Sequence, residues 1–246
     1  MRIFIPSGCA DPDAAKAVIT DPGDVHHIRG VMRMGRGEKI TLCGPEGLEY
    51  ECVITSARQT AVELEILSSA PSRSEPRVYV SVYAAMMKGD KMDELVMKCI
   101  ELGASAITPF ISSRCVSRPD AGQAEKKRDR LNRIARGAAQ QSMRGRLPQV
   151  GTTLSFEAAV GRALESDLAV FLYENERETG LSDVLADTQP NTVSIMSGPE
   201  GGFSPDEAAY AVSKGMKPAT LGRRILRCET APLCALAAVM YQYGEF

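Results

Sequence analysis

The chain has little of what a metal site needs. Its only histidines are the adjacent His26 and His27, and none of its seven cysteines forms a CxxC pair. Zinc sites use histidines and cysteines at short, regular spacings, so neither zinc nor any other bound metal is expected. The cysteine count is odd and the cysteines sit singly in apolar runs, which favours reduced thiols in a cytoplasmic protein.

Long apolar runs are also missing. The N-terminus has no hydrophobic segment of the secretory type, and the longest apolar stretch, near Ala231–Tyr241, falls short of the roughly 20 residues that span a bilayer. No membrane partner is therefore expected. The glycine patterns of the Rossmann fold and of the P-loop are absent as well, which argues against a dinucleotide or a nucleoside triphosphate as the ligand.

A strong charge of one sign is absent overall, since 29 Lys and Arg face 31 Asp and Glu. The charges are nevertheless distributed unevenly. Residues 1–70 carry 7 Lys or Arg against 10 Asp or Glu, whereas residues 114–146 carry 10 against 3. A basic block of this kind is typical of a nucleic-acid contact. A solvated helix face explains the charge equally well.

The pattern of residues changes near position 71. Before it, short runs of β-forming residues predict strands at 2–6, 38–43, 49–56 and 61–67, which favours a small β-barrel. Residues 71–76 are polar and include prolines, as expected of a linker. From residue 77 to 246, strand-like and helix-like runs alternate, which predicts a parallel α/β sheet with its ligand at the carboxyl ends of the strands.

Two loops that bear glycines stand out in the second half of the chain. The first, Ser197–Glu207, has three glycines in five positions and then a helix start, with Ser204 as N-cap, Pro205 at the first helical position and Glu207 completing a capping box. The second is Leu221–Ala231. Each loop lies between a strand-like and a helix-like run, so backbone amides of both could form one pocket.

This pair of loops, in this order, resembles the RsmE family of SPOUT methyltransferases. Three more segments resemble motifs of that family, namely His26–Met34, the stretch from Lys88 to Gly103, and Ala138–Arg144. The matches run from about residue 26 to residue 231 in the family's order. The chain departs from the family pattern at two positions, Arg223, where Pro or Lys is frequent, and Cys228, where Thr is expected.

The resemblance implies an α/β protein with an N-terminal PUA-like RNA-binding β-barrel and a C-terminal SPOUT domain tied into a trefoil knot. It implies an enzyme that methylates N3 of one uridine in 16S rRNA of the small ribosomal subunit, with S-adenosylmethionine as cofactor. A homodimer is expected. Two alternatives stay open: a SPOUT methyltransferase that acts on another RNA or on a ribose hydroxyl, and a non-catalytic RNA-binding assembly factor of the same fold.

Candidate cofactor ligands lie in the loops that follow strands. Gly198 and Gly201 come first, because glycine lets a ligand approach the backbone closely, although a tight turn before a helix explains them too. The other candidates are Leu172, Glu174, Leu221, Gly222, Ile225, Leu226 and Arg227. Glu174 could accept a hydrogen bond from a ribose hydroxyl. Core packing, or a solvated carboxylate at Glu174, is the alternative.

The reaction that the resemblance implies sets a chemical requirement. Uridine N3 carries a proton and is a poor nucleophile until that proton leaves, so a cation that stabilises the developing anion, or a general base, is expected. Arg227 is the candidate cation, and Glu200 or Glu229 the candidate base. Glu229 could instead stabilise a helix N-terminus, and Glu200 could order its own loop.

Candidate RNA contacts are spread along the chain. The expected phosphate partners are Arg29, Arg33, Lys88, Lys91, Arg144 and Arg146. Gln140, Gln141 and Ser142 could contact the target nucleotide, unless they simply form an uncharged helix end. Because the target lies in folded RNA, the uridine is expected to be splayed or flipped out.

Overall fold

The computed structural model describes residues 1–45, 47–186 and 188–246. The chain forms two compact units, one of Met1–Glu75 with Ala139–Leu147 and one of Pro76–Ala138 with Pro148–Phe246. The sequence placed a linker at residues 71–76, whereas the last strand of the first unit continues through Pro71. It also assigned residues 139–147 to the second domain, whereas this segment packs with the first unit.

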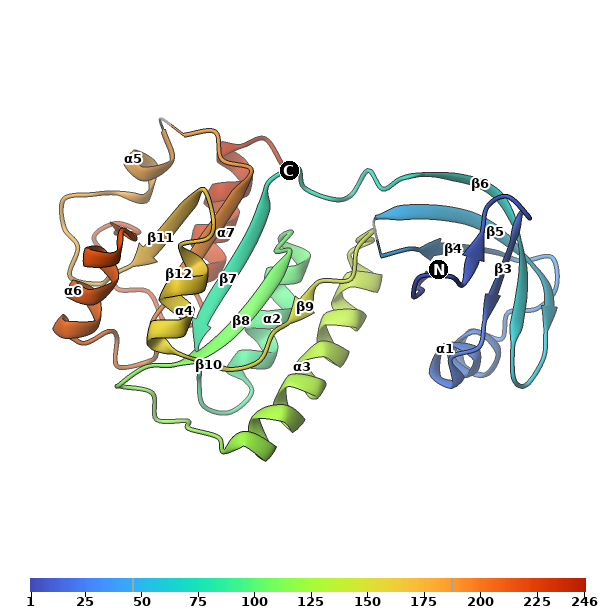
Figure 1. Ribbon diagram of the computed structural model, residues 1–246, viewed down its shortest axis with the longest axis horizontal. Helices are drawn as coiled ribbons and strands as arrows, with labels where there is room; N and C mark the ends of the chain where they lie inside the picture. The colour runs from blue at the N-terminus through green and yellow to red at the C-terminus, as the bar shows by residue number, and fades with distance from the viewer. Residues whose placement is uncertain (46, 187) are drawn as a thin grey trace. The chain divides into compact units, whose positions relative to one another are not determined.

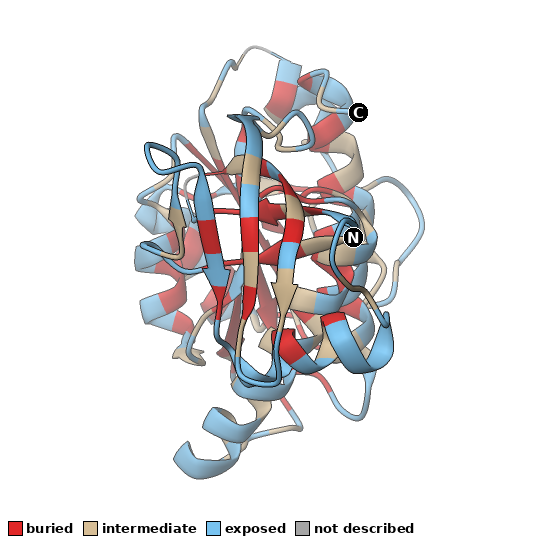
Figure 2. Ribbon diagram, turned by 90° about the vertical axis from the view of Figure 1, so that its right-hand side faces the viewer, coloured by how far each residue is buried: buried red, intermediate tan, exposed pale blue. Residues whose placement is uncertain are grey.

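The first unit is built on one six-stranded sheet of order β1-β4-β5-β6-β3-β2 (Figure 1). Its strands are β1 (Arg2–Phe4), β2 (Ala10–Asp11), β3 (Lys16–Ile19), β4 (Lys39–Cys43), β5 (Leu48–Ala57) and β6 (Val62–Pro71). β1 pairs with β4 in parallel, and the other neighbours are antiparallel. Buried and exposed positions alternate along these strands (Figure 2), as expected of a sheet with one covered face.

An apolar core fills the covered face of this sheet. Its fully buried members include Ile3, Ile28, Leu42, Cys52 and Val62. Helix α1 (Pro22–His26) and the short π-helix η1 (His27–Val31) contribute Val25 and Ile28 to it. Helix α1 starts where Asp21 accepts from the Asp24 amide at 2.9 Å. The two histidines therefore lie at the junction of the two helices, His26 as the last residue of α1 and His27 as the first of η1.

The second unit is an α/β structure on a seven-stranded parallel sheet, as the sequence predicted. The order is β10-β8-β7-β12-β11-β13, and β9 pairs with β8. The strands are β7 (Tyr79–Ala85), β8 (Ala106–Ile111), β9 (Gln149–Val150), β10 (Leu154–Ser155), β11 (Leu168–Leu172), β12 (Thr192–Ser197) and β13 (Lys217–Ala219).

Helices cover both faces of this sheet, and most residues of its central strands β7, β11 and β12 are therefore buried. The helices are α2 (Lys91–Glu101), α3 (Ala121–Gln141), α4 (Phe156–Ala163), α5 (Leu181–Ala186), α6 (Pro205–Lys214) and α7 (Ala231–Gln242). Helices α4 and α7 both pack on β7 and β12, and Figure 1 shows them on opposite faces. Every residue of β11 is buried as a result.

The predicted start of α6 is confirmed. The Ser204 hydroxyl accepts from the Glu207 amide at 3.2 Å, and the Glu207 carboxylate accepts from the Ser204 amide at 2.9 Å. Glu207 also accepts from the Ser113 amide at 2.7 Å. Burial opposes ionisation of Glu207, but these amide donors outweigh it and lower the pKa of the carboxyl. These hydrogen bonds thus fix the end of the loop after β12, at the point where α6 begins.

Two expectations about composition can be compared with the structure. Within the described ranges, no helix is both long enough and apolar enough to cross a bilayer. The cysteines, which were expected to be reduced, are all free thiols; Cys43, Cys52, Cys99 and Cys115 are buried, Cys9 and Cys228 are half-buried, and Cys234 is exposed.

Candidate functional site

A cavity of about 540 Å³ opens in the second unit where β11, β12 and β13 end. It is lined by the loops that follow these strands and by the first residue of α2. The lining comprises Leu172–Glu174, Ser197–Gly202, Ala219–Gly222, Arg224–Glu229, Ala231 and Lys91. The structure therefore brings together every residue predicted to bind the cofactor, and also the three candidate catalytic residues.

The glycines of the two loops are needed for different reasons. Gly202 and Gly222 have φ angles of +65° and +104°, which side chains rarely allow. A Cβ on Gly202 would also collide with the Glu174 carboxylate, so that carboxylate lies directly against the loop. A Cβ on Gly198 would come within 3.0 Å of the buried Phe203 ring, so a side chain there would need this ring to shift.

Ser197, the last residue of β12, carries an unsatisfied polar group. The side chain is 2% exposed, and within the described residues its hydroxyl has no hydrogen-bond partner. A buried hydroxyl without a partner costs free energy, so a polar ligand atom in the cavity would stabilise it. Sequence analysis missed Ser197; the available signal was its position at the end of a predicted strand, directly before Gly198.

A cluster of charges lies beside the cavity. The Lys91 ammonium is 3.3 Å from Glu229 Oε2 and 3.8 Å from Glu200 Oε1. The Cys228 thiol donates to Glu229 Oε2 at 3.0 Å, and the Arg227 guanidinium lies 4.0 Å from Glu229 Oε1. Lys91 was predicted to contact RNA phosphate, but here it faces two carboxylates.

The neighbours of Glu229 set its protonation state. The thiol hydrogen bond from Cys228 and the Lys91 ammonium lower the pKa of Glu229 below its ordinary value of 4.5. Burial and the adjacent carboxylate raise the pKa of Cys228 to about 12, so the thiol keeps its proton. Because the pKa of Glu229 is depressed on folding, its pairing contributes stability above pH 4.5 and loses it as the pH falls through the lowered value.

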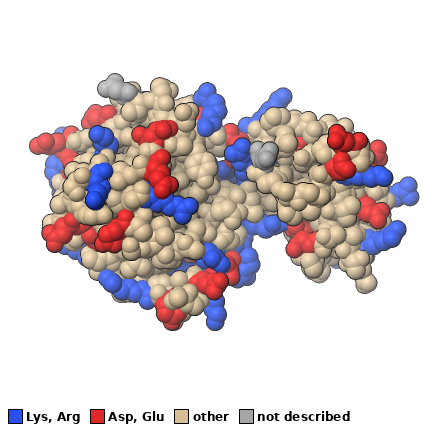
Figure 3. Space-filling model, viewed as in Figure 1, with Lys and Arg blue, Asp and Glu red and all other residues tan. Residues whose placement is uncertain are grey.

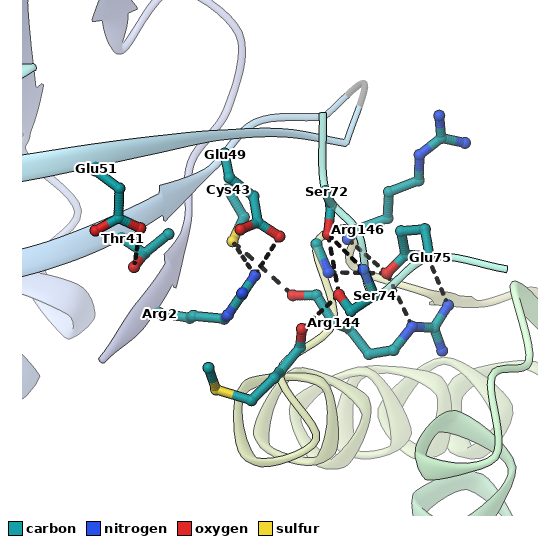
Figure 4. A network of polar contacts seen from close by, with 12 residues as sticks. Arg2, Thr41, Cys43, Glu49, Glu51, Ser72, Ser74, Glu75, Arg144 and Arg146 are labelled. Carbon is teal, nitrogen blue, oxygen red and sulfur yellow. Dashed lines mark hydrogen bonds and ion pairs between the residues drawn. The ribbon is translucent and has the colours of Figure 1, made fainter. Parts of the chain in front are cut away.

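Arg144, a predicted phosphate contact, has a different environment in the first unit (Figure 4). It is 3% exposed, and its Nε and Nη2 each donate to the Glu75 carboxylate at 2.9 Å. Glu75 also accepts from the amides of Gly145 and Arg146, at 2.8 and 3.1 Å. A guanidinium in a buried bidentate pair is not presented to a phosphate, so the geometry favours a structural role for Arg144.

The other RNA candidates vary in exposure. Arg29, Arg33, Lys88, Gln141 and Arg146 are exposed. Gln140 and Ser142 are half-buried, and Gln140 donates to the Arg2 carbonyl at 3.2 Å. On the face drawn in Figure 3, acidic side chains are interspersed with basic ones on each unit. On that face, charge alone therefore does not locate an RNA surface.

No cluster of three or more His, Cys, Asp or Glu residues suited to a metal occurs in the part of the chain that the structure describes.

Comparisons with known proteins agree with this architecture. The family model for the RNA methyltransferase domain matches residues 74–240, and that for the RNA methyltransferase PUA domain matches residues 19–67. Ribosomal RNA small subunit methyltransferase E of Bacillus subtilis is 35% identical over 224 residues, which cover 89% of this chain and 88% of that protein.

Two solved structures extend the comparison. Ribosomal RNA small subunit methyltransferase E from Neisseria gonorrhoeae, bound to S-adenosylmethionine, is 30% identical with a TM-score of 0.85, over 98% of this chain and 96% of that one. A putative methyltransferase from Legionella pneumophila, in complex with the same cofactor, is 29% identical with a TM-score of 0.83 over the same shares. With a PUA domain followed by a SPOUT methyltransferase domain, the chain belongs to the ribosomal RNA small subunit methyltransferase E (RsmE) family.

Proposed function

We propose that this protein transfers a methyl group from S-adenosylmethionine to N3 of one uridine in small-subunit ribosomal RNA. The observation that carries the proposal is the cavity at the ends of β11, β12 and β13, which gathers the predicted cofactor ligands in one place. Membership of an RNA methyltransferase family supports the reaction class, and the names of the relatives support the small subunit as substrate.

The cavity suits this cofactor in size and in lining. Its volume of about 540 Å³ is in the range of small-molecule sites. Leu221, Ile225 and Leu226 offer apolar walls, and Ile225, 69% exposed in the structure, would be shielded from water by a ligand. The Ser197 hydroxyl needs a polar partner, and Glu174 can accept from a ribose hydroxyl. Bound S-adenosylmethionine supplies an electrophilic methyl group, so the protein contributes mainly proximity and orientation.

Arg227 is the proposed cation of the reaction. Its side chain is 83% exposed at the cavity, and the carboxylate nearest to it is 4.0 Å away. A guanidinium there can stabilise the negative charge that develops on uracil as N3 loses its proton. Of the two carboxylates considered as the base, Glu229 is the weaker candidate because its pKa is lowered. Glu200 remains the candidate base.

The RNA would be held by exposed side chains of each unit. We retain Arg29, Arg33, Lys88 and Arg146 as phosphate contacts, since all four are exposed. Gln141 and Ser142 stay candidates for contact with the target nucleotide. Arg144 is set aside for the reason given above, and the role of Lys91 is considered below.

The position of the methyl group tests the proposal. Small ribosomal subunits from a strain that lacks the gene, incubated with the purified protein and S-adenosylmethionine, should yield N3-methyluridine on mass spectrometry of the digested RNA. Subunits incubated without the methyl donor are the control. A methyl group on ribose or on C5 would favour a different SPOUT activity. Absence of cofactor binding in calorimetry would favour the non-catalytic assembly factor.

We also propose that the protein is a homodimer whose second unit contains the trefoil knot of its superfamily. Tyr241 and Phe246, near the end of α7, are 80% and 74% exposed and offer apolar surface to a second copy. A twofold contact would bury the same surface on both subunits. Light scattering at micromolar concentration should give twice the chain mass of 26.5 kDa. A mass equal to that of one chain would contradict the dimer.

A further inference from the structure

In the part of the chain that the structure describes, Lys91 connects two loops that are otherwise not joined by polar contacts. It is the first residue of α2, and its ammonium reaches Glu200 in the loop after β12 and Glu229 in the loop before α7, at 3.8 and 3.3 Å. Among the described residues, no hydrogen bond or ion pair runs directly between residues 198–203 and 221–229. The side chain of Lys91 is therefore the ionic link between the two glycine-bearing loops.

The surrounding contacts turn this link into a network of three segments. Glu200 Oε1 also accepts from the Lys88 amide at 3.2 Å, which ties its loop to the segment before α2. Glu229 is fixed from the other side by the Cys228 thiol at 3.0 Å. Each carboxylate that Lys91 contacts is thus held by a second donor, so the ammonium binds two oriented partners.

We infer that Lys91 is a positioning residue that holds the two glycine-bearing loops in the arrangement the cofactor requires. The inference rests on the proposed function, because it assumes that this cavity binds S-adenosylmethionine. Lys91 acts through Glu200 and Glu229 and need not touch the cofactor. Gly202 and Gly222, with positive φ angles, give the loops a backbone that L side chains rarely adopt, and the ion pairs favour that arrangement over others.

Electrostatics argue against the role that the sequence suggested for Lys91. One ammonium and one guanidinium face two carboxylates here, so the cluster has no excess of positive charge with which to attract a phosphate. A lysine that binds RNA backbone would instead be expected on a surface with an excess of positive charge.

Calorimetry with S-adenosylmethionine on the full chain tests the inference. Lys91→Met keeps the aliphatic stem and removes the charge, and it should weaken binding roughly 5- to 50-fold, because two oriented carboxylates lose their shared partner. Lys91→Arg should recover most of the affinity. Lys98→Met is the matched control, since Lys98 lies on the same helix and pairs with Glu94 at 3.8 Å outside the cavity. An affinity for Lys91→Met equal to that of Lys98→Met would overturn the inference.

Hydrogen exchange provides a readout that needs no cofactor. Amides of residues 200–203 and 223–229 should exchange faster in Lys91→Met than in the unmodified chain, and those of the sheet should not. If the unmodified chain fails to bind S-adenosylmethionine, the proposed function fails, whereas the exchange experiment still tests the link. An RNA-binding salt slope that falls by about 0.7–0.9 in Lys91→Met, with unchanged exchange, would return Lys91 to the role of phosphate contact.

Discussion

Replacement of Arg227 by alanine is expected to slow methyl transfer by about 100- to 1000-fold, the usual effect of removing one donor aimed at developing charge. The fold should stay intact, because the Arg227 side chain is 83% exposed and its carbonyl still accepts from the amides of Thr230 and Ala231. Single-turnover assays on purified small subunits measure the chemical step. Calorimetry should show a much smaller change in S-adenosylmethionine affinity.

Arg223→Ala is the matched control for this experiment. Arg223 lies in the same loop and is exposed, but it does not line the cavity. Its removal should leave the single-turnover rate near that of the unmodified protein. The rate should also rise with pH, since the target nitrogen must lose its proton. A normal single-turnover rate for Arg227→Ala would remove the guanidinium from the mechanism.

Replacement of Arg144 by methionine is expected to destabilise the protein by about 3–5 kcal/mol, because it leaves the largely buried Glu75 carboxylate without its ionic partner. The side chains of Arg144 and Glu75 are only 4% and 14% exposed. Urea unfolding of the full chain, followed by circular dichroism, should show the loss as a lower transition midpoint with a similar slope. An unchanged midpoint would show that the pair contributes nothing.

Two further variants sharpen the test of this ion pair. Arg146→Met keeps the backbone amide that donates to Glu75 and changes only an exposed side chain, so its effect should be below about 1 kcal/mol. The double variant Arg144→Met with Glu75→Gln should be more stable than Arg144→Met alone, because the unpaired charge is removed while the Gln carbonyl can still accept from the amides of Gly145 and Arg146. Additive losses would argue that the two side chains stabilise the unit independently.

The features that could be predicted from the sequence are those that depend on residues close together in the chain. The capping box at Ser204 and Glu207 needs only four residues, and the alternation of strands and helices after residue 76 follows from local apolar patterns. The loops around the cavity could be placed because the carboxyl ends of parallel strands meet at one edge. Strand β3, by contrast, has four residues, too few for a reliable pattern.

The features that were missed depend on partners distant in the chain. Lys91 and Glu229 are far apart in sequence, and nothing near Lys91 indicates that carboxylates rather than phosphates face it. Arg144 and Glu75 are 69 residues apart. The sequence alone does not show whether a basic side chain binds an external phosphate or a carboxylate of the same chain. Only the fold decides between these two uses.

The pairing of Glu75 with Arg144 also has a consequence for the order of events during synthesis. The first 75 residues leave the ribosome before the segment 139–147 that completes their unit has been made. At roughly 5–20 residues per second, synthesis from Glu75 to Arg144, 69 positions later, takes about 3–14 seconds. During that interval, the Glu75 carboxylate of the nascent N-terminal unit lacks its arginine partner. A fragment cut at the apparent boundary would therefore correspond to an unfinished stage of folding.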